Sequence, residues 1–230
     1  MNLLHIVSTP RGLTSNTARV SSAFLEAMHD KYNDLAVTTL DLFTMDLPAV
    51  AGANIESKYQ LMTGQKLDAG RVASWHQIEK QIERFLSADI YLLTVPMWNF
   101  SIPYALKYYI DAIVQPGYLF RYDEHGIPHG LVQGKRMICV TSRGGDYSGY
   151  MKGYDFVEPY LRTIFGFVGI SDVHFINAQP MDVSVEVRHA AQKNAITEAR
   201  TLVADLEWQS QSAVANPENP SGLKPAPIAA

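Results

Sequence analysis

The hydrophobic and polar positions of this chain follow two alternating patterns. Short apolar runs with the composition of buried strands occur at residues 2–8, 35–42, 90–96, 136–142 and 173–179. Longer segments with apolar residues at helical spacing separate these runs and predict helices over residues 15–32, 67–89, 103–114, 156–169 and 186–208. Within residues 67–89 the helical pattern is clear only in the second half.

The alternation of strand and helix predicts the fold class. Connections between successive parallel strands are right-handed, so the helices cover both faces of a parallel sheet. The pattern therefore predicts an α/β fold: an open, doubly wound, five-stranded parallel sheet with helices on both faces. In such sheets ligands bind at the carboxyl ends of the strands, where the strand order reverses. This rule points to the loops after the first, third and fourth strands.

Three segments fall outside this alternation. Residues 43–64 have weak periodicity with interspersed Gly, Pro and Asn, which predicts a long surface excursion. Residues 118–135 alternate aromatic positions before a run of turn residues, which indicates a hairpin or a lid. Residues 209–230 are rich in Pro, Ala, Asn and Ser, and we expect a loosely held tail there, behind a domain formed by residues 1–208.

Composition and charge narrow the class of protein. With 230 residues, of which 47% are hydrophobic, the chain is long enough for one large domain or two small ones. A net charge of -4 and a pI near 6.0 provide no basic excess to neutralise phosphates, which argues against non-specific nucleic-acid binding. No nucleic-acid partner is therefore expected.

The sequence also bears on location. No apolar stretch reaches the roughly 18 to 20 residues that cross a bilayer, and the start lacks the basic and apolar regions of a signal peptide. The single cysteine, Cys139, lies in a predicted strand and fits a reducing compartment. We expect a soluble cytoplasmic protein without a membrane partner.

The first candidate loop, residues 8–17, leads directly into a predicted helix. Unpaired N–H groups and the positive end of the dipole make a helix start favourable for an anion. A helix cap requires one side chain, whereas this loop offers Ser8, Thr9, Thr14, Ser15, Asn16 and Thr17. The excess favours a phosphate site. Neither G-x-x-x-x-G-K-[ST] nor G-x-G-x-x-G occurs in the chain, which favours a mononucleotide over a dinucleotide.

The other two candidate loops also have unusual compositions. Residues 94–103, TVPMWNFSIP, place three large apolar side chains around Asn99, where a turn normally carries small polar residues. Such a loop either folds back as a hydrophobic plug or receives an apolar ligand. In residues 142–150, Gly144 and Gly145 form either an ordinary tight turn or a place where backbone approaches a flat ligand. Three unusual loops at one edge of one sheet favour a ligand site.

Taken together, these motifs resemble a known family. Pro96-Met97-Trp98-Asn99-Phe100, Ser142-Arg143-Gly144-Gly145 and the hydroxyl-rich first loop are similar to those of the FMN-dependent NADH azoreductases, which belong to the flavodoxin-like quinone reductases. The resemblance extends from about residue 2 to about residue 206. It implies that residues 1–208 form a flavodoxin-like FMN-binding domain, with residues 209–230 a flexible C-terminal tail that has no counterpart in the family.

The resemblance assigns roles to individual positions. For the FMN phosphate it implicates Thr9, Ser15, Asn16 and Thr17, with Arg11 as an addition. Along the ribityl chain and isoalloxazine ring it places Pro96, Met97, Trp98, Asn99 and Phe100. At the pyrimidine side of the ring it places Ser142, Arg143, Gly144 and Gly145. Trp98 departs from the family pattern, since many relatives have Tyr there.

The activity implied by the resemblance depends on the cofactor. NADH or NADPH would reduce FMN, and a quinone or azo compound would then be reduced in a ping-pong cycle, without an obligatory side-chain acid or base. Backbone N–H groups near Asn99 and the two glycines would stabilise the reduced, anionic flavin. The resemblance also implies a homodimer with two sites at its interface. Candidates for the substrate cleft are Phe120, Tyr122 and Tyr147, with structural packing equally open for the first two.

Several other residues are predicted to be structural. His125 and His129 flank Gly126 and Pro128, which breaks helical geometry and favours a surface loop over a metal pair. Tyr108 and Tyr109 are expected in helix packing or subunit contact. Phe165 and Phe167 are expected in the core.

Two other classes of protein remain open. A flavodoxin-type electron carrier shares the fold and FMN, but it serves protein partners as a one-electron shuttle. A flavin-free protein would use the fold for partner recognition. The choice between NADH and NADPH and the identity of the physiological acceptor also remain open.

Overall fold

The central sheet has the predicted architecture. The computed structural model describes residues 1–62, 65 and 67–207, so the predicted tail, residues 209–230, lies outside the described residues. Five parallel strands, β1 (Asn2–Val7), β2 (Ala36–Asp41), β3 (Ile90–Pro96), β6 (Arg136–Ser142) and β7 (Asp172–Ala178), lie in the order β2-β1-β3-β6-β7. The order reverses between β1 and β3, as in flavodoxin-like sheets. The doubly wound fold predicted from the sequence is confirmed.

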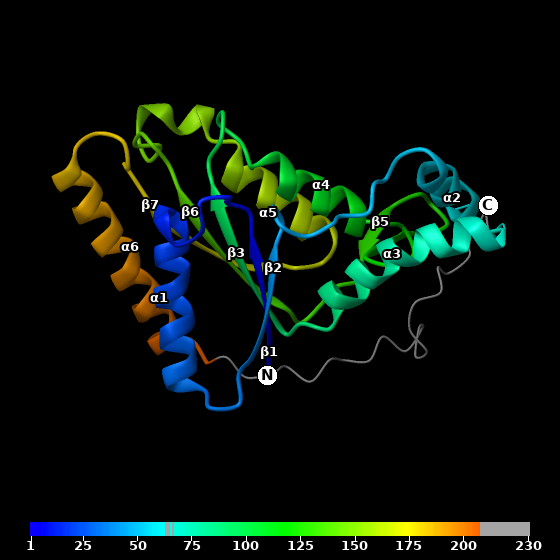
Figure 1. The fold of residues 1–230 in the computed structure, drawn as a ribbon, viewed down its shortest axis with the longest axis horizontal. Coiled ribbons are helices and arrows are strands. Elements are labelled where there is room, and N and C mark those ends of the chain that lie inside the picture. The colour runs from blue at the N-terminus through cyan, green and yellow to red at the C-terminus, as the bar shows by residue number, and fades with distance from the viewer. Residues whose placement is uncertain (63–64, 66, 208–230) are drawn as a thin grey trace.

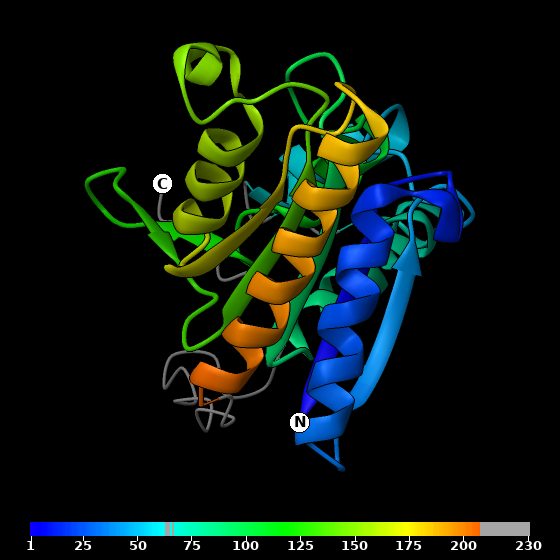
Figure 2. The same cartoon turned by 90° about the vertical axis from the view of Figure 1, so that its left-hand side faces the viewer.

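Helices cover both faces of the sheet, as Figures 1 and 2 show. One face carries α1 (Asn16–Lys31) and α6 (Val185–Asp205), whose buried residues form one core with Leu3 of β1. The other carries α3 (Ala69–Leu86), α4 (Tyr104–Ile113) and α5 (Val157–Phe167), which form a second core with Leu4 and Ile6. The alternation along β1 sends neighbouring side chains to opposite faces.

The excursion between β2 and β3 is more regular than its sequence predicts. It contains α2 (Ala53–Met62), and α3 is helical from Ala69 onward. Asp68 caps α3, because its carboxylate accepts the N–H of Arg71 at 3.0 Å. The Ser74 hydroxyl donates to Asn54 Oδ1 at 2.5 Å. The first half of α3 thus packs against α2 and contributes only Trp75 to the buried core beside the sheet, which explains why it has no apolar stripe.

The segment predicted to be a hairpin or a lid is a hairpin of β4 (Phe120–Tyr122) and β5 (Pro128–Gly130). It packs on the end of α5, where the Val132 N–H donates to the Val168 carbonyl at 2.8 Å. A Cβ added to Gly130 would lie 2.3 Å from the backbone nitrogen of Gly169. Glycine is therefore required at position 130 by the close approach of two backbones.

The residues predicted to be structural occupy ordinary positions. Cys139 and Phe165 are fully buried, and Phe167 is partly buried against the same core. Tyr109 is buried within α4, whereas Tyr108 is exposed and donates to the Leu47 carbonyl at 3.4 Å.

The two histidines of the hairpin region lie at the surface. His125 is exposed, and His129 Nε2 lies 2.7 Å from the carboxylate of Asp123. Within the described part of the chain, no group of His, Cys, Asp and Glu residues is arranged to hold a metal ion. None of the helices in that part has the length and apolar character needed to cross a membrane.

Candidate functional site

The three loops singled out from the sequence meet at the carboxyl edge of the sheet. The hydroxyl of Thr17, at the start of α1, lies 2.5 Å from that of Ser142, at the end of β6. The Met97 N–H donates to the Ser142 carbonyl at 2.9 Å, and the Ser8 N–H to the Thr94 carbonyl at 3.0 Å. Hydrogen bonds therefore join all three loops at the reversal in strand order.

The first loop ends in a helix start suited to an anion. A short 3₁₀ helix, Gly12–Thr14, precedes Ser15, whose hydroxyl caps α1 by accepting the N–H of Ala18 at 3.4 Å. Asn16 and Thr17 occupy the first turn of α1, where backbone N–H groups have no intrahelical acceptor. Ser15 does act as a helix cap, yet its own O–H remains available to donate.

The remaining residues of the first loop differ in exposure. Thr9 is buried, and its hydroxyl accepts the N–H of Arg11 at 3.4 Å. The Arg11 side chain is exposed at the rim of the loop. The Thr14 hydroxyl donates to the Arg11 carbonyl at 2.7 Å and so supports the turn. A cation at the rim and a polar floor are compatible with a bound phosphate.

A buried polar cluster that the sequence reasoning missed lies beneath this loop. His5 Nε2 and the Ser21 hydroxyl lie 2.8 Å and 2.7 Å from the Thr94 hydroxyl, and the Ser8 hydroxyl donates to the Thr94 carbonyl at 2.7 Å. Burial lowers the pKa of His5 to about 4, so the ring is neutral at physiological pH. The signal in the sequence that could have revealed this cluster is a polar residue within each of two apolar strand patterns: His5 in β1 and Thr94 in β3.

The second loop contains a strained turn. Trp98 and Ser101 exchange two backbone hydrogen bonds of 2.9 Å and 3.0 Å, and the central residues Asn99 and Phe100 have φ of 48° and 69°. Positive φ at both central positions is typical of a type I′ turn, where glycine is preferred. A bulky residue at positive φ is rare and costs on the order of 1–3 kcal/mol. Residues held in such conformations cluster at functional sites.

Trp98 partly fills the second loop, as a hydrophobic plug would, and partly lines a pocket that could receive a ligand. Its ring lies 5.7 Å from that of Phe43 and 6.3 Å from that of Tyr104, and the latter two rings are 5.5 Å apart. These three side chains form an aromatic trio that ties the excursion after β2 to the second loop. Trp98 remains only partly buried, with one side facing a pocket.

That pocket has a volume of about 450 Å³, within the range of small-molecule sites. Burial, reinforced by the charge of Asp111, raises the pKa of Tyr160 to about 12, so its hydroxyl stays protonated. Lys107 lies 2.7 Å from the Asp111 carboxylate, which offsets its charge. The walls are mainly aromatic and apolar, with few polar groups: Trp98, Asn99, Ser101, Ile102, Tyr104, Lys107 and Tyr160.

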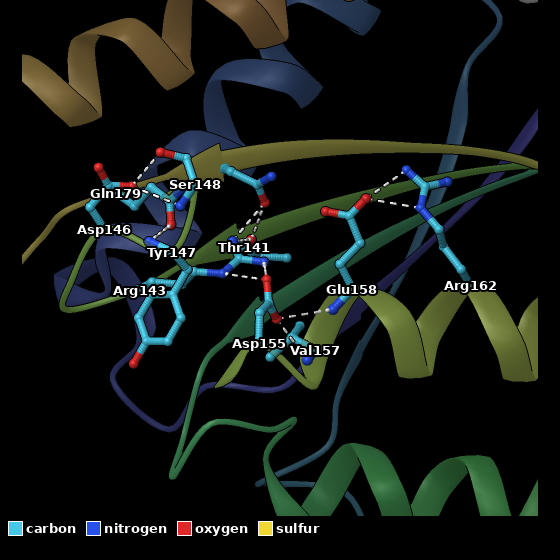
Figure 3. A network of polar contacts seen from close by, with 11 residues as sticks. Thr141, Arg143, Asp146, Tyr147, Ser148, Asp155, Val157, Glu158, Arg162 and Gln179 are labelled. Carbon is cyan, nitrogen blue, oxygen red and sulfur yellow. Dashed lines mark hydrogen bonds and ion pairs between the residues drawn. The ribbon is translucent and has the colours of Figure 1, made fainter. Parts of the chain in front are cut away.

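The Arg143 side chain of the third loop points into the protein (Figure 3). Its guanidinium donates to Thr141 Oγ1 at 2.6 Å, to Asn177 Oδ1 at 2.7 Å and to Asp155 Oδ2 at 2.7 Å and 3.1 Å. The side chain is only 1% exposed. Arg143 is predicted to flank a flavin ring, but its side chain is turned away from the loop surface, so only its backbone is placed to contact a ligand at the carboxyl edge of the sheet. Pro96 and Met97 precede the turn and are partly buried, and Gly144 and Gly145 are partly buried in the loop.

The three cleft candidates are not brought together within one chain. The Tyr147 N–H in the third loop donates to Gln179 Oε1 at 3.2 Å, which holds Tyr147 near the site. Phe120 is buried against Phe167, with ring centroids 4.6 Å apart, and Tyr122 is exposed. Their hairpin contacts the C-terminal end of α5, an 11-residue helix about 16 Å long, whereas the third loop leads towards its N-terminal end (Figures 1 and 2).

Comparison with known proteins assigns the family. Residues 1–203 match a protein family with a flavodoxin-like fold. The chain is 35% identical over 207 residues to an FMN-dependent NADH:quinone oxidoreductase of Nitratidesulfovibrio vulgaris, a match that covers 89% of this chain and 99% of the relative. This chain belongs to that flavodoxin-like family. The resemblance predicted from the loop motifs is confirmed.

Other members of the family support the same assignment. An FMN-dependent NADH:quinone oxidoreductase of Nostoc punctiforme is 37% identical over 215 residues, covering 90% of this chain and all of the relative. The structure of an FMN-dependent NADH-azoreductase from Bacillus anthracis in complex with FMN has a TM-score of 0.78 and 27% identity, covering 88% of this chain and 99% of that one. An azoreductase from Bacillus anthracis shares the fold with a TM-score of 0.82 at 24% identity, covering 90% and 100%.

Proposed function

We propose that this protein is an FMN-dependent oxidoreductase that transfers reducing equivalents from NADH or NADPH to quinones and azo compounds. The observation that carries the proposal is the hydrogen-bonded meeting of three loops at the reversal in strand order. It joins an anion-favouring helix start to a strained aromatic turn and a glycine pair. Relatives named FMN-dependent NADH:quinone oxidoreductase support the same activity.

The residues present fit FMN. The phosphate would lie at the start of α1, against the N–H groups of Asn16 and Thr17 and the hydroxyls of Thr9 and Ser15, with Arg11 at the rim. The flat ring system would lie between the second and third loops, along residues 96–100 and 142–145. The neutral floor formed by His5 adds no charge beneath the phosphate.

When bound, FMN supplies the two-electron chemistry, and the chain supplies position and hydrogen bonds. Backbone N–H groups of Asn99, Gly144 and Gly145 are the proposed donors to the electron-rich edge of the ring. Tyr160 keeps its proton because of its raised pKa and can orient a carbonyl or azo nitrogen by hydrogen bonding. No side chain of the site is assigned as an obligatory acid or base, so the residues bind and orient the reactants.

The proposal includes an assembly. Exposed aromatic side chains gather in the second loop, at the start of α4 and around the 3₁₀ helix Tyr150–Tyr154: Phe100, Tyr104, Tyr150, Tyr154 and Phe156. Such a surface supports a homodimer in which the second copy covers the site. The exposed Tyr122 would then wall the partner's cleft, whereas Phe120, buried against Phe167, would support it from beneath. Light scattering at micromolar concentration tests the mass. A cytoplasmic location is proposed with it, and cell fractionation tests that location.

Rapid mixing of the purified, FMN-loaded protein with NADH or NADPH tests the activity. Direct bleaching of the flavin absorbance, followed by reoxidation with quinones and azo compounds, is the expected result. A panel of both nicotinamides against both acceptor classes then ranks the substrates. Flavin that is reduced only by a protein partner would instead identify an electron carrier.

A further inference from the structure

A buried ion pair connects the third loop to the start of α5 (Figure 3). Arg143 donates through Nε and Nη2 to Asp155 Oδ2 at 3.1 Å and 2.7 Å, with side chains only 1% and 12% exposed. The same guanidinium holds Thr141 of β6 and Asn177 of β7 through Nη1. The Arg143 side chain therefore binds β6, β7 and the segment at Asp155, twelve residues further along the chain, to one another.

Both carboxylate oxygens of Asp155 are occupied. Oδ1 accepts the N–H groups of Val157 and Glu158 at 2.9 Å and 3.3 Å, which caps the start of α5. Because Oδ2 is held by Arg143, the backbone on either side of Asp155 has little freedom to rotate. The position of Tyr154 and Phe156 is thus set by the ion pair.

Those two neighbours hold the strained turn of the second loop. The Phe156 N–H donates to the Phe100 carbonyl at 3.0 Å, and the Tyr154 ring lies 5.8 Å from the Phe100 ring. Phe100 has φ of 69°, a conformation that persists only where surrounding contacts impose it. Contacts on both the backbone and the ring of Phe100 come from the segment that Asp155 fixes.

We propose that Arg143 and Asp155 are positioning residues that hold the Asn99–Phe100 turn in its left-handed conformation, ready for the flavin ring. The inference rests on the proposed function. It assigns Arg143 a task other than ring contact: its guanidinium acts through Asp155 and the Phe156 amide. No residue at the phosphate end of the site, at the start of α1, belongs to this chain of contacts; the nearest link is the contact of Thr17 with Ser142, which precedes Arg143.

Binding of FMN and of riboflavin, which lacks the phosphate, separates the two ends of the site. Asp155→Asn preserves the oxygen that caps α5 but weakens the grip of Arg143, and is expected to weaken both ligands by a similar factor of about ten. The double variant Arg143→Met with Asp155→Asn leaves no buried charge unpaired and is expected to behave alike. Glu158→Gln breaks an exposed ion pair with Arg162 on the same helix and is the matched control, expected to stay within about twofold.

A glycine background tests the role of strain directly. Glycine adopts positive φ readily, so in a Phe100→Gly protein the Asp155→Asn change is expected to weaken riboflavin by less than about twofold. A general loss of structure would instead give the same factor in both backgrounds. Unchanged riboflavin affinity in the Asp155→Asn and double variants would overturn the proposal, as would a loss confined to FMN.

Hydrogen exchange in the flavin-free protein keeps this proposal distinct from the function. The Phe156 amide is expected to be protected in the native chain and to exchange faster in Asp155→Asn, while Glu158→Gln leaves it unchanged. A native protein that binds neither flavin would refute the proposed function, whatever the exchange data. Flavin binding with an unprotected Phe156 amide would refute the positioning role alone.

Discussion

Replacing Gly130 with alanine is expected to destabilise the protein, whereas the same change at Gly166 is expected to stabilise it. A Cβ at position 130 would lie 2.3 Å from both the Gly169 nitrogen and the Val168 carbonyl carbon. Both obstacles are backbone atoms, so no side chain can swing aside. A Cβ at position 166, within α5, meets no atom within 4 Å.

The magnitudes follow from these contacts. To reach ordinary separation, β5 and the end of α5 must move apart by about 1 Å. Overpacking of this kind costs typically 1–3 kcal/mol, and the rigid surroundings place Gly130→Ala near about 3 kcal/mol. For a chain of this size that corresponds to a melting temperature lower by about 6–12 °C. Gly166→Ala replaces a poor helix former and is expected to gain up to about 1 kcal/mol, or about 2–4 °C.

Urea unfolding followed by circular dichroism, together with calorimetry, measures both variants against the native chain. The expected result is a shift in midpoint of opposite sign with an unchanged denaturant slope. A Gly130→Ala protein that melts within about 1 °C of the native one would show that the two backbones do not approach as described. Destabilisation by Gly166→Ala would refute the assignment of open space beside α5.

Three further predictions concern the site and the core. The pKa of His5 is lowered from 6.5 to about 4 in the folded protein, so the unfolded chain takes up the proton first as pH falls. The free energy of unfolding is therefore expected to decrease by up to about 3 kcal/mol between about pH 6.5 and about pH 4. Urea titrations of His5→Gln should show a weaker dependence on pH. Trp98→Ala and Asn99→Ala are each expected to lower FMN affinity by about fivefold to tenfold, and Trp98→Ala is also expected to change the relative kcat/KM among acceptors. If FMN affinity and kcat/KM were unchanged in both variants, the second loop would be a hydrophobic plug. Burial raises the pKa of the Cys139 thiol, so a thiol reagent is expected to react only after unfolding, and rapid reaction of the native protein would contradict its burial.

The sheet and most helices could be predicted because each segment's own apolar pattern shows which of its side chains are buried. β3 and β6 are buried on both faces and are mainly apolar along their length, as parallel strands are. By contrast, α2 and the first half of α3 pack on one another through contacts such as that of Ser74 with Asn54. Their pattern reflects a partner helix outside the sheet, which sequence periodicity does not reveal.

The meeting of the three loops could be predicted from the sequence, but the contacts within them could not. Topology brings the three loops together, and their composition marked them as unusual. The direction of the Arg143 side chain depends on Asp155 and Asn177, which are distant in sequence and reach it only through the folded sheet. The left-handed conformation of Phe100 is likewise imposed by tertiary contacts, because its residue type disfavours that conformation.

The aromatic trio of Phe43, Trp98 and Tyr104 has a consequence for how this enzyme family can diversify. Phe43 lies at the start of the excursion, a connecting segment of the kind that tolerates substitution and insertion. Through Trp98 it reaches one wall of the pocket, while the cofactor loops are tied to each other by separate hydrogen bonds. Mutations that accumulate in the excursion can therefore change which acceptors enter by shifting Trp98, while the contact between Thr17 and Ser142, at the phosphate end, is left in place.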